Sequence, residues 1–169
     1  MNGAIIAGNL CTLVAMGCNA ISSTRKTPKG VLLMQNASQV VYAVSSIVLG
    51  GYSATVQNVV SIIRNYVAIW KWKSKALEWV LVVLGVVLGV AFNNRGWVGL
   101  LPVVGNLQYT LAIFRFKDDE EKIKIFFLIS LLAFICFNFA ICNYVGVVAD
   151  SIVAVTTTIM LIKTAKKKA

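Results

Sequence analysis

The segment GYSATVQNVVSIIRNYVAIWKWK, residues 51–73, contains the features that decide the fold of this chain. It is long and apolar enough to be a membrane-spanning helix, which needs about 20 such residues, and it ends in lysines. Its interior also holds Gln57, Asn58, Arg64 and Asn65, which are costly in lipid unless they face a partner or a cavity. The segment therefore predicts a transmembrane helix with one polar side.

The rest of the chain has the same apolar character. Of its 169 residues, 59% are hydrophobic and 13% are charged, which lies outside the usual range of soluble domains. No basic residues precede the first apolar window, so it predicts a retained span and not a cleaved signal peptide. The expected fold class is an all-α polytopic membrane protein with seven transmembrane helices, at 3–22, 30–50, 52–71, 76–93, 96–114, 122–142 and 144–163.

Basic residues indicate how these helices are oriented. They follow the first, third, fifth and seventh spans, at 25–29, 71–75, 115–124 and 163–168, whereas the other junctions hold only Arg95. Lys and Arg collect on the cytoplasmic side of membrane proteins, so we expect the N-terminus outside and the C-terminus in the cytoplasm. The same placement accounts for the net charge of +10 without binding to nucleic acid.

Residues that enzymes and metal sites need are scarce in this sequence. The chain has no histidine, and its four cysteines lie in or beside apolar windows without a close CxxC pair, so we expect them to be packing residues. The acidic run 118–121 lies among basic residues and is expected to be a neutralised loop. Asp150 is a lone carboxylate inside a span, and the sequence therefore predicts no enzyme, no metal site and no cofactor.

An internal repeat organises the predicted helices. Residues 51–73 align with residues 143–165. The matches are Tyr52 with Tyr144, Asn58 with Asp150, Lys71 with Lys163, and, farther up each triplet, Gly8-Asn9-Leu10 with Gly105-Asn106-Leu107. We therefore expect two parallel three-helix bundles, residues 1–73 and 95–163, joined by a linker helix in 74–94 and followed by a basic cytoplasmic tail, 164–169.

The predicted linker helix differs from the other six. It is nearly free of polar side chains, and Gly85 and Gly89 give it a face on which another helix can approach closely. We expect this helix to pack on the outside of the bundle.

Polar residues recur at three- and four-residue steps in each helix of the first triplet and so form stripes. The stripes are Asn9, Thr12, Met16 and Asn19; Gln35, Gln39, Tyr42 and Ser46; and Thr55, Asn58, Ser61 and Asn65. Such stripes either line a water-accessible cavity near the middle of the membrane or form hydrogen bonds between helices, worth roughly 1 kcal/mol each. Three stripes in one triplet favour the cavity.

The cavity interpretation gives a predicted substrate site. Its residues are Asn9, Gln35, Gln39, Tyr42, Asn58, Ser61, Asn106, Tyr109, Asn138 and Asp150. The ionisable residues Arg64 and Asp150 are candidates for ion coupling, at depths that differ by about 9 Å at the rise of a helix. For Arg64 the alternative is that its side chain extends to the cytoplasmic headgroups.

These residues resemble the YgjV-type family of small bacterial inner-membrane proteins. The motifs that carry the resemblance are Leu49-Gly50-x-Tyr52, Ile63-Arg64, Leu100-Leu101-Pro102-Val103-x-Gly105, Phe114-Arg115 and Asn138-Phe139. The resemblance covers most of the chain and implies a place in the bacterial inner membrane, without a substrate. At residues 156–158 this chain has three threonines where the family tends to have a basic residue, which leaves the role of that end of the last span open.

The three-plus-one-plus-three layout also resembles the SWEET sugar carriers and the PnuC vitamin carriers. That resemblance implies a central site in which Asn58 and Asp150 contact the substrate. We expect a transporter or facilitator of a small polar metabolite (a sugar, nucleoside or vitamin precursor) that works by alternating access in the lipid bilayer. The alternative is a non-transporting membrane protein with a structural, regulatory or lipid-handling role. A monomer is sufficient to enclose the site, and a homo-oligomer is left open.

Overall fold

The structure is a computed structural model of the chain, and it describes residues 2–23, 28–70, 74–116 and 119–168. Several basic residues on which the predicted orientation rests lie outside the described residues: Arg25, Lys26, Lys71, Lys73 and Lys117. So does Asp118 of the acidic run.

Seven α-helices make up the described chain, as the sequence predicted, and no strand occurs in it. They are α1 (Gly3–Ser23), α2 (Pro28–Val48), α3 (Tyr52–Ile69), α4 (Lys75–Ala91), α5 (Gly96–Arg115), α6 (Glu120–Ala140) and α7 (Tyr144–Lys168). Two helices begin where a side chain accepts a hydrogen bond from the first turn: Ser74 from the amide of Leu77 and Asp119 from that of Lys122. The last helix continues through most of the predicted basic tail.

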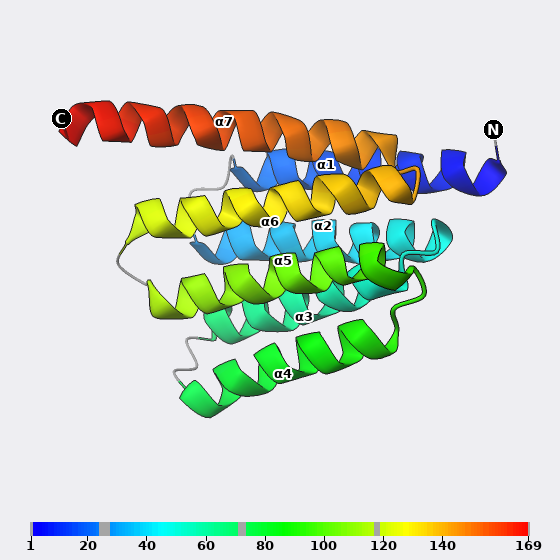
Figure 1. Cartoon of the computed structure of the whole chain (residues 1–169), viewed down its shortest axis with the longest axis horizontal. Coiled ribbons are helices and arrows are strands. Elements are labelled where there is room, and N and C mark those ends of the chain that lie inside the picture. The colour runs from blue at the N-terminus through cyan, green and yellow to red at the C-terminus, as the bar shows by residue number, and fades with distance from the viewer. Residues whose placement is uncertain (1, 24–27, 71–73, 117–118, 169) are drawn as a thin grey trace.

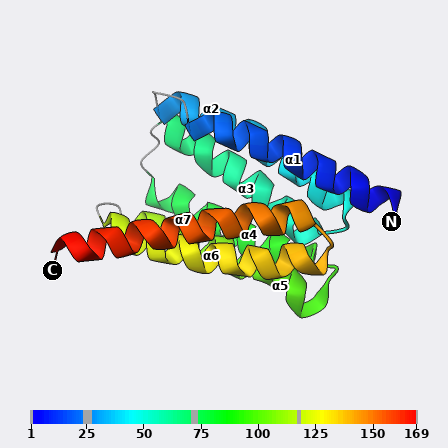
Figure 2. The same cartoon turned by 90° about the horizontal axis from the view of Figure 1, so that it is seen from above.

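Six of the helices form two rows of three (Figures 1 and 2). In the first row α2 packs between α1 and α3, and in the second α6 packs between α5 and α7. The rows meet along their borders, where α1 contacts α7 and α3 contacts α5, and α4 packs against α3 and α5. In Figure 2, α1 and α7 lie close together toward the end that carries the N-terminus and diverge toward the other end.

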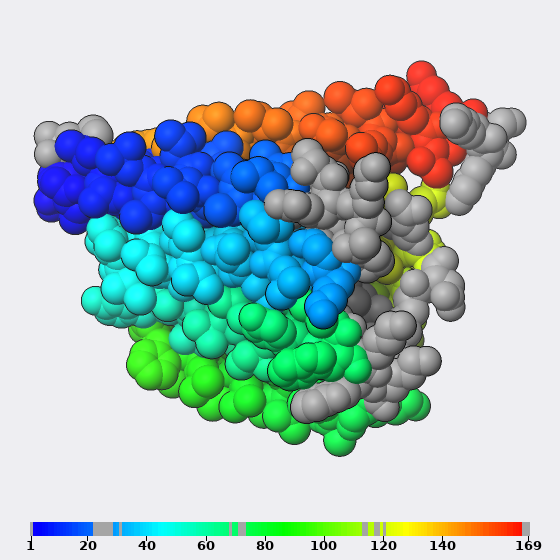
Figure 3. Space-filling view, turned by 180° about the vertical axis from the view of Figure 1, so that it is seen from behind, coloured from blue at the N-terminus to red at the C-terminus, as the bar shows by residue number. Residues whose placement is uncertain are grey.

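The outer side of the first row is apolar. Figure 3 shows this side, with α1, α2 and α3 next to one another and α4 beyond them. Large exposed hydrophobic residues on it include Leu10, Leu13, Val40, Val44, Val59 and Ile63. Soluble monomers rarely expose contiguous apolar surfaces of this size, so this side fits contact with lipid.

Within the described residues, three helical segments are long and apolar enough to cross a membrane by length and composition alone. They are Gly3–Ile21, Glu121–Ala140 and Tyr144–Lys166. The linker helix α4 has 17 residues and is shorter than any of these.

A small apolar core joins the two rows at the end that carries the N-terminus. Leu49 and Ala54 of the first row pack with Phe137 and Ile141 of the second, and Ile5 and Leu101 lie against them. We call this end, which includes the junctions 49–51, 93–95 and 141–143, the clamped end. The rows are held together there by both apolar packing and hydrogen bonds.

Two junctions at the clamped end have the same backbone structure. Gly50 and Cys142 both have positive φ, 70° and 60°. Gly51 N donates to Ser46 O at 2.7 Å, and Asn143 N donates to Asn138 O at 2.8 Å. This pattern ends a helix with a left-handed residue. Gly50 and Cys142 are separated in sequence by the same number of residues as Tyr52 and Tyr144. The alignment of residues 51–73 with 143–165 therefore also pairs positions with the same backbone conformation.

The close-approach face expected of the linker helix is present in α4. A Cβ atom on Gly85 would lie 3.5 Å from Val60 of α3, and one on Gly89 would lie 2.7 Å from Val103 of α5. Gln57 of α3 donates to Gly85 O at 2.8 Å. The glycines therefore allow α4 to sit against both rows.

We predict that Gly89→Ala lowers the free energy of unfolding by about 1–3 kcal/mol, because the added methyl group overpacks the contact with Val103. Gly17→Ala is the matched control, since no atom lies within 4 Å of a Cβ built there, and it should be neutral or stabilise by about 0.5–1 kcal/mol. Thermal unfolding of the two purified variants in detergent measures both effects. Equal midpoints would contradict the packing of α4.

We also predict that Cys142→Gly stabilises the protein by about 1 kcal/mol, because a left-handed backbone is unfavourable for residues with a Cβ. Cys136→Gly is the control, since Cys136 lies inside α6, where glycine should destabilise by about 1 kcal/mol. The same unfolding assay should show shifts of opposite sign, and two shifts of the same sign would rule out the left-handed turn.

Candidate functional site

Many polar residues of the predicted stripes join neighbouring helices of one row. Thr12 and Ser45 share a hydrogen bond of 2.7 Å between α1 and α2. The amide of Asn65 donates to Asn36 at 2.9 Å, between α3 and α2. These four residues are buried, so the packing interpretation is correct for them. Thr12 and Asn65 had been assigned to cavity-facing stripes, and those two assignments were wrong.

Asn9 lies at the clamped end and connects the two rows. Its side-chain amide donates to Cys142 O at 2.9 Å, and its carbonyl accepts from Val145 N at 2.9 Å. Along the other border, Arg95 donates to Leu49 O at 2.9 Å and to Gly50 O at 3.0 Å. The structure therefore places Asn9 in a contact that holds the rows together.

The polar stripe of α2 faces the second row. On one side of α2, Ser45 bonds to α1, and on another, Asn36 bonds to α3. The exposed apolar residues Val40, Val44 and Ile47 occupy the outer side. By helical periodicity, the remaining side is that of Gln35, Gln39, Tyr42 and Ser46, which points toward α6.

The backbones of α2 and α6 do not approach each other closely. No Cα atom of α2 lies within 8 Å of a Cα atom of α6, although α1 and α7, and α3 and α5, do approach that closely. Gln35 and Gln39 are half-buried. Among the residues that the structure describes, no hydrogen bond is formed by either amide, so both are available to a ligand.

Asn58 lies on the inner side of α3. Positions 54, 58, 61 and 65 recur at helical spacing and share one side. Ala54 on this side packs with Phe137 of the second row, and Ser61 is buried. Asn58 is half-buried, and its amide has no hydrogen-bond partner within the described ranges. It is therefore the residue of α3 best placed to contact a ligand between the rows.

Asp150 of α7 belongs to a polar group near the clamped end. Asn138 donates to its carboxylate at 2.8 Å, and Asn143 donates to Asn138 at 3.0 Å. Two of the predicted site residues, Asn138 and Asp150, are thus brought together. Tyr42 of α2, which is hydrogen-bonded to Asn19, lies within electrostatic range of Asp150 across the rows.

Arg64 forms a second polar group on the border between α3 and α5. Its Nη1 donates to Thr110 Oγ1 at 3.2 Å and to Asn106 Oδ1 at 3.5 Å. Its guanidinium lies over the ring of Tyr109, 5.8 Å from the centroid, and that ring packs on Phe127 of α6 at 5.2 Å. These partners draw the side chain into the protein, so the alternative of an arginine that extends to the cytoplasmic headgroups is wrong.

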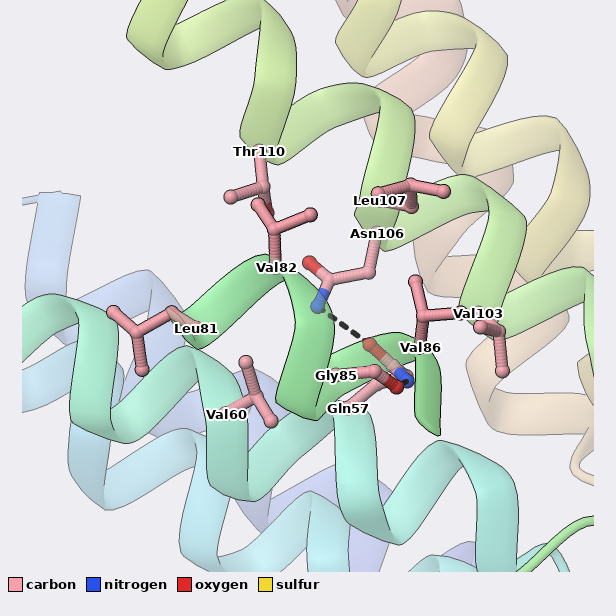
Figure 4. A pocket seen from close by; sticks show the side chains of 10 residues that line it. All are labelled: Gln57, Val60, Leu81, Val82, Gly85, Val86, Val103, Asn106, Leu107 and Thr110. Atoms are coloured by element: carbon pink, nitrogen blue, oxygen red, sulfur yellow. Dashed lines mark hydrogen bonds between the residues drawn. The ribbon is translucent and has the colours of Figure 1, made fainter. Parts of the chain in front are cut away.

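A small pocket adjoins this second group, among α3, α4 and α5 (Figure 4). Asn106 donates to Gln57 at 2.8 Å on its polar side, and Thr110 also contributes. The rest of its lining is apolar: Val60, Leu81, Val82, Gly85, Val86, Val103 and Leu107. This pocket lies beside the linker helix, away from the stripe of α2.

Most of the predicted site residues thus divide into two groups and a set that forms no hydrogen bond with any described residue. Asn106 and Tyr109 gather around Arg64, Asn138 bonds to Asp150 with Tyr42 in range, and Gln35, Gln39 and Asn58 make up the third set. Asn9 joins the rows at the clamped end, and Ser61 is buried on α3. Gln57 and Phe127 were missed as site neighbours: Gln57 was assigned only to the flank of a stripe, and Phe127 lies in an apolar run without a polar signal. In the described part of the chain, no three His, Cys, Asp or Glu residues are placed to hold a metal ion.

Comparison with known proteins identifies the family but no individual relative. No curated protein and no solved structure matches the chain. The family model Imp-YgjV, described as a bacterial inner membrane protein, matches residues 6–168. Because the match covers nearly the whole sequence, this chain belongs to the YgjV family of bacterial inner membrane proteins.

Proposed function

We propose that the protein crosses the inner membrane seven times and carries a small polar metabolite between its two rows of helices. In this proposal the rows are parallel repeats joined by α4. The repeat is supported by the similar backbone conformation and hydrogen bonding of the junctions at Gly50 and Cys142. The contacts between helices support it too. If the rows are repeats, α1 corresponds to α5 and α7 corresponds to α3, so the contact of α1 with α7 is equivalent to the contact of α5 with α3. This is the layout expected from the resemblance to SWEET and PnuC carriers.

The observation that carries the proposal is a set of polar side chains on the inner sides of α2 and α3 that form no hydrogen bond with any residue the structure describes. These side chains, Gln35, Gln39 and Asn58, are half-buried. Polar groups inside a membrane protein are costly unless they are bonded to protein, water or ligand. Side chains kept there at that cost fit a binding site for a polar molecule.

The basic residues set the direction of transport in this proposal. The clamped end would face the periplasm and the opposite end, where the basic junctions lie, the cytoplasm. The rows are joined at the clamped end by Asn9, Arg95 and the apolar core. The structure would then correspond to a carrier closed toward the periplasm, and release of these contacts would open it.

A second candidate function is a non-transporting, structural role. The bonds of Thr12 with Ser45 and of Asn65 with Asn36 favour it, because they use polar residues only to hold helices together. Gln35, Gln39 and Asn58 do not fit that role.

Fusions of reporter proteins test the seven-span topology. Alkaline phosphatase fused after Asn94 should be active, because this junction is placed in the periplasm, and a green fluorescent protein fused after Ala169 should fluoresce, because the C-terminus is placed in the cytoplasm. The controls are green fluorescent protein fused after Asn94, which should not fluoresce, and alkaline phosphatase fused after Ala169, which should be inactive. An active phosphatase after Ala169 would show that the orientation is opposite to the proposed one.

Two asparagines of α3 distinguish the carrier from the structural role. Asn58→Ala should lower uptake about fivefold, the effect of losing a ligand hydrogen bond of roughly 1 kcal/mol, with little change in thermal midpoint. Asn65→Ala should instead lower the midpoint, because it breaks the bond to Asn36. Uptake is measured in proteoliposomes with radiolabelled sugars, nucleosides and vitamin precursors.

The opposite result separates the two functions. If no compound of a broad panel is taken up and both variants lose only stability, the carrier is wrong and the structural role stands.

A further inference from the structure

Arg64 is a cation inside the bundle, and none of the described carboxylates is its partner. The described acceptors of its guanidinium are a threonine hydroxyl and an asparagine carbonyl, both neutral, at 3.2 and 3.5 Å. In the ranges that the structure covers, no carboxylate forms an ion pair with it. A buried charge without a counter-charge is strongly destabilising, so its retention calls for a ligand that supplies the negative charge.

The guanidinium lies within the length of α5, between its middle and its basic end. Its acceptors Asn106 and Thr110 stand about 14 and about 8 Å from the last residue of α5 (Gly96–Arg115) at the rise of a helix. Side chains on a helix tilt toward its N-terminus, which for α3 is the clamped end. Arg64 therefore points away from the basic end of the bundle.

Several donors of Arg64 remain for a ligand. A guanidinium has five N–H donors, and both described hydrogen bonds start from Nη1. Among the described residues, no acceptor is bonded to Nε or Nη2. The residue is half-buried, so these donors are free to bind two oxygens of a carboxylate or phosphate side by side.

Aromatic rings hold the guanidinium in place and shape the adjoining surface. The guanidinium lies over the ring of Tyr109, with Arg64 Cζ 5.8 Å from the ring centroid, and Phe127 packs against Tyr109. A cation over an aromatic face is stabilised without losing its charge. The rings also offer an apolar surface next to the cation, which suits an anion that carries a ring or a carbon chain.

We propose that Arg64, with Tyr109, Asn106 and Thr110, binds an anionic group, a carboxylate or a phosphate. This rests on the proposed function, of which it names the substrate class: an organic anion and not a neutral sugar. A second source of such an anionic group is the phosphate of a lipid headgroup.

The test uses the full-length protein in phosphatidylcholine nanodiscs, with thermal unfolding followed during titration. The probes are benzoate, benzamide as its uncharged isostere, and inorganic phosphate, at constant ionic strength. Benzoate or phosphate should raise the midpoint of the wild type, and benzamide should not. Arg64→Gln should weaken anion binding tenfold or more, since hydrogen bonds to charged groups contribute about 1.5–3 kcal/mol.

Two further variants keep the result interpretable. Arg64→Lys retains the charge but not the forked donors, so its anion affinity should lie between those of the wild type and Arg64→Gln, and it replaces Arg64→Gln if that variant does not fold. Arg115→Gln is the matched control, because Arg115 is exposed at the end of α5, and it should respond as the wild type does.

The outcomes separate the ligand sources and the two proposals. A shift that depends on Arg64 and appears only when phosphatidylglycerol is added assigns the site to a lipid headgroup. Anion binding through Arg64 without any uptake in proteoliposomes keeps the anion site and removes the carrier. Uptake of a neutral solute, with no effect of anions on the thermal midpoint, keeps the carrier and removes the anion site. An anion shift unchanged in Arg64→Gln, or absent with every probe and lipid, overturns the anion site.

Discussion

The cost of a polar group without a partner in lipid is the constraint on which this structure depends. It accounts for the side-chain hydrogen bonds that join neighbouring helices, such as Asn65 with Asn36, and for Gln57, which connects α3 to both α4 and α5. It also makes the exceptions informative, because none of them lies on the outer sides of the helices. Gln35, Gln39 and Asn58 lie on inner sides and Arg64 on the α3–α5 border. The outer sides carry large apolar residues, such as Leu13, Val44 and Ile63.

The same constraint shapes the way the two rows are joined. Asn9 and Arg95 bond to backbone groups of the junctions before α7 and α3, at 2.9–3.0 Å. The bonds of Asn9 contribute about 1 kcal/mol each and those of the charged Arg95 about 1.5–3 kcal/mol each, and none of them belongs to the hydrogen bonds inside a helix. At the clamped end the rows are joined by these contacts, by the bond of Asn94 to Gly50 O at 2.9 Å and by the small apolar core at Phe137 and Leu49. In the proposed carrier, release of these contacts would separate the rows there without unfolding a helix.

Sequence patterns predicted the helices well and the site only in part. Long apolar runs bounded by charged or glycine-containing junctions give helix ends within a few residues, because lipid thickness fixes their length. Periodicity showed which polar residues share a side of a helix, but not what that side faces, and so Thr12 and Asn58 looked alike. The direction of Arg64 depends on Asn106 and Tyr109, which lie far away in the sequence. Phe127 gave no signal, because a phenylalanine in an apolar span looks the same whether it faces lipid or a site.

The two rows have similar junctions at Gly50 and Cys142 but carry different charges, which bears on how a ligand would lie between them. At the repeat spacing, Asn58 corresponds to Asp150 and Arg64 to Thr156, whose hydroxyl bonds to Ile152 O of its own helix at 2.8 Å. The cation therefore lies on the α3–α5 border and the carboxylate on α7, each without its counterpart in the other row. A site built from identical halves would bind a ligand equally well in two orientations. With an anionic group bound at Arg64, a hydrogen-bond donor of the ligand would be directed toward Asp150, so the unequal charges allow a single orientation of an asymmetric molecule.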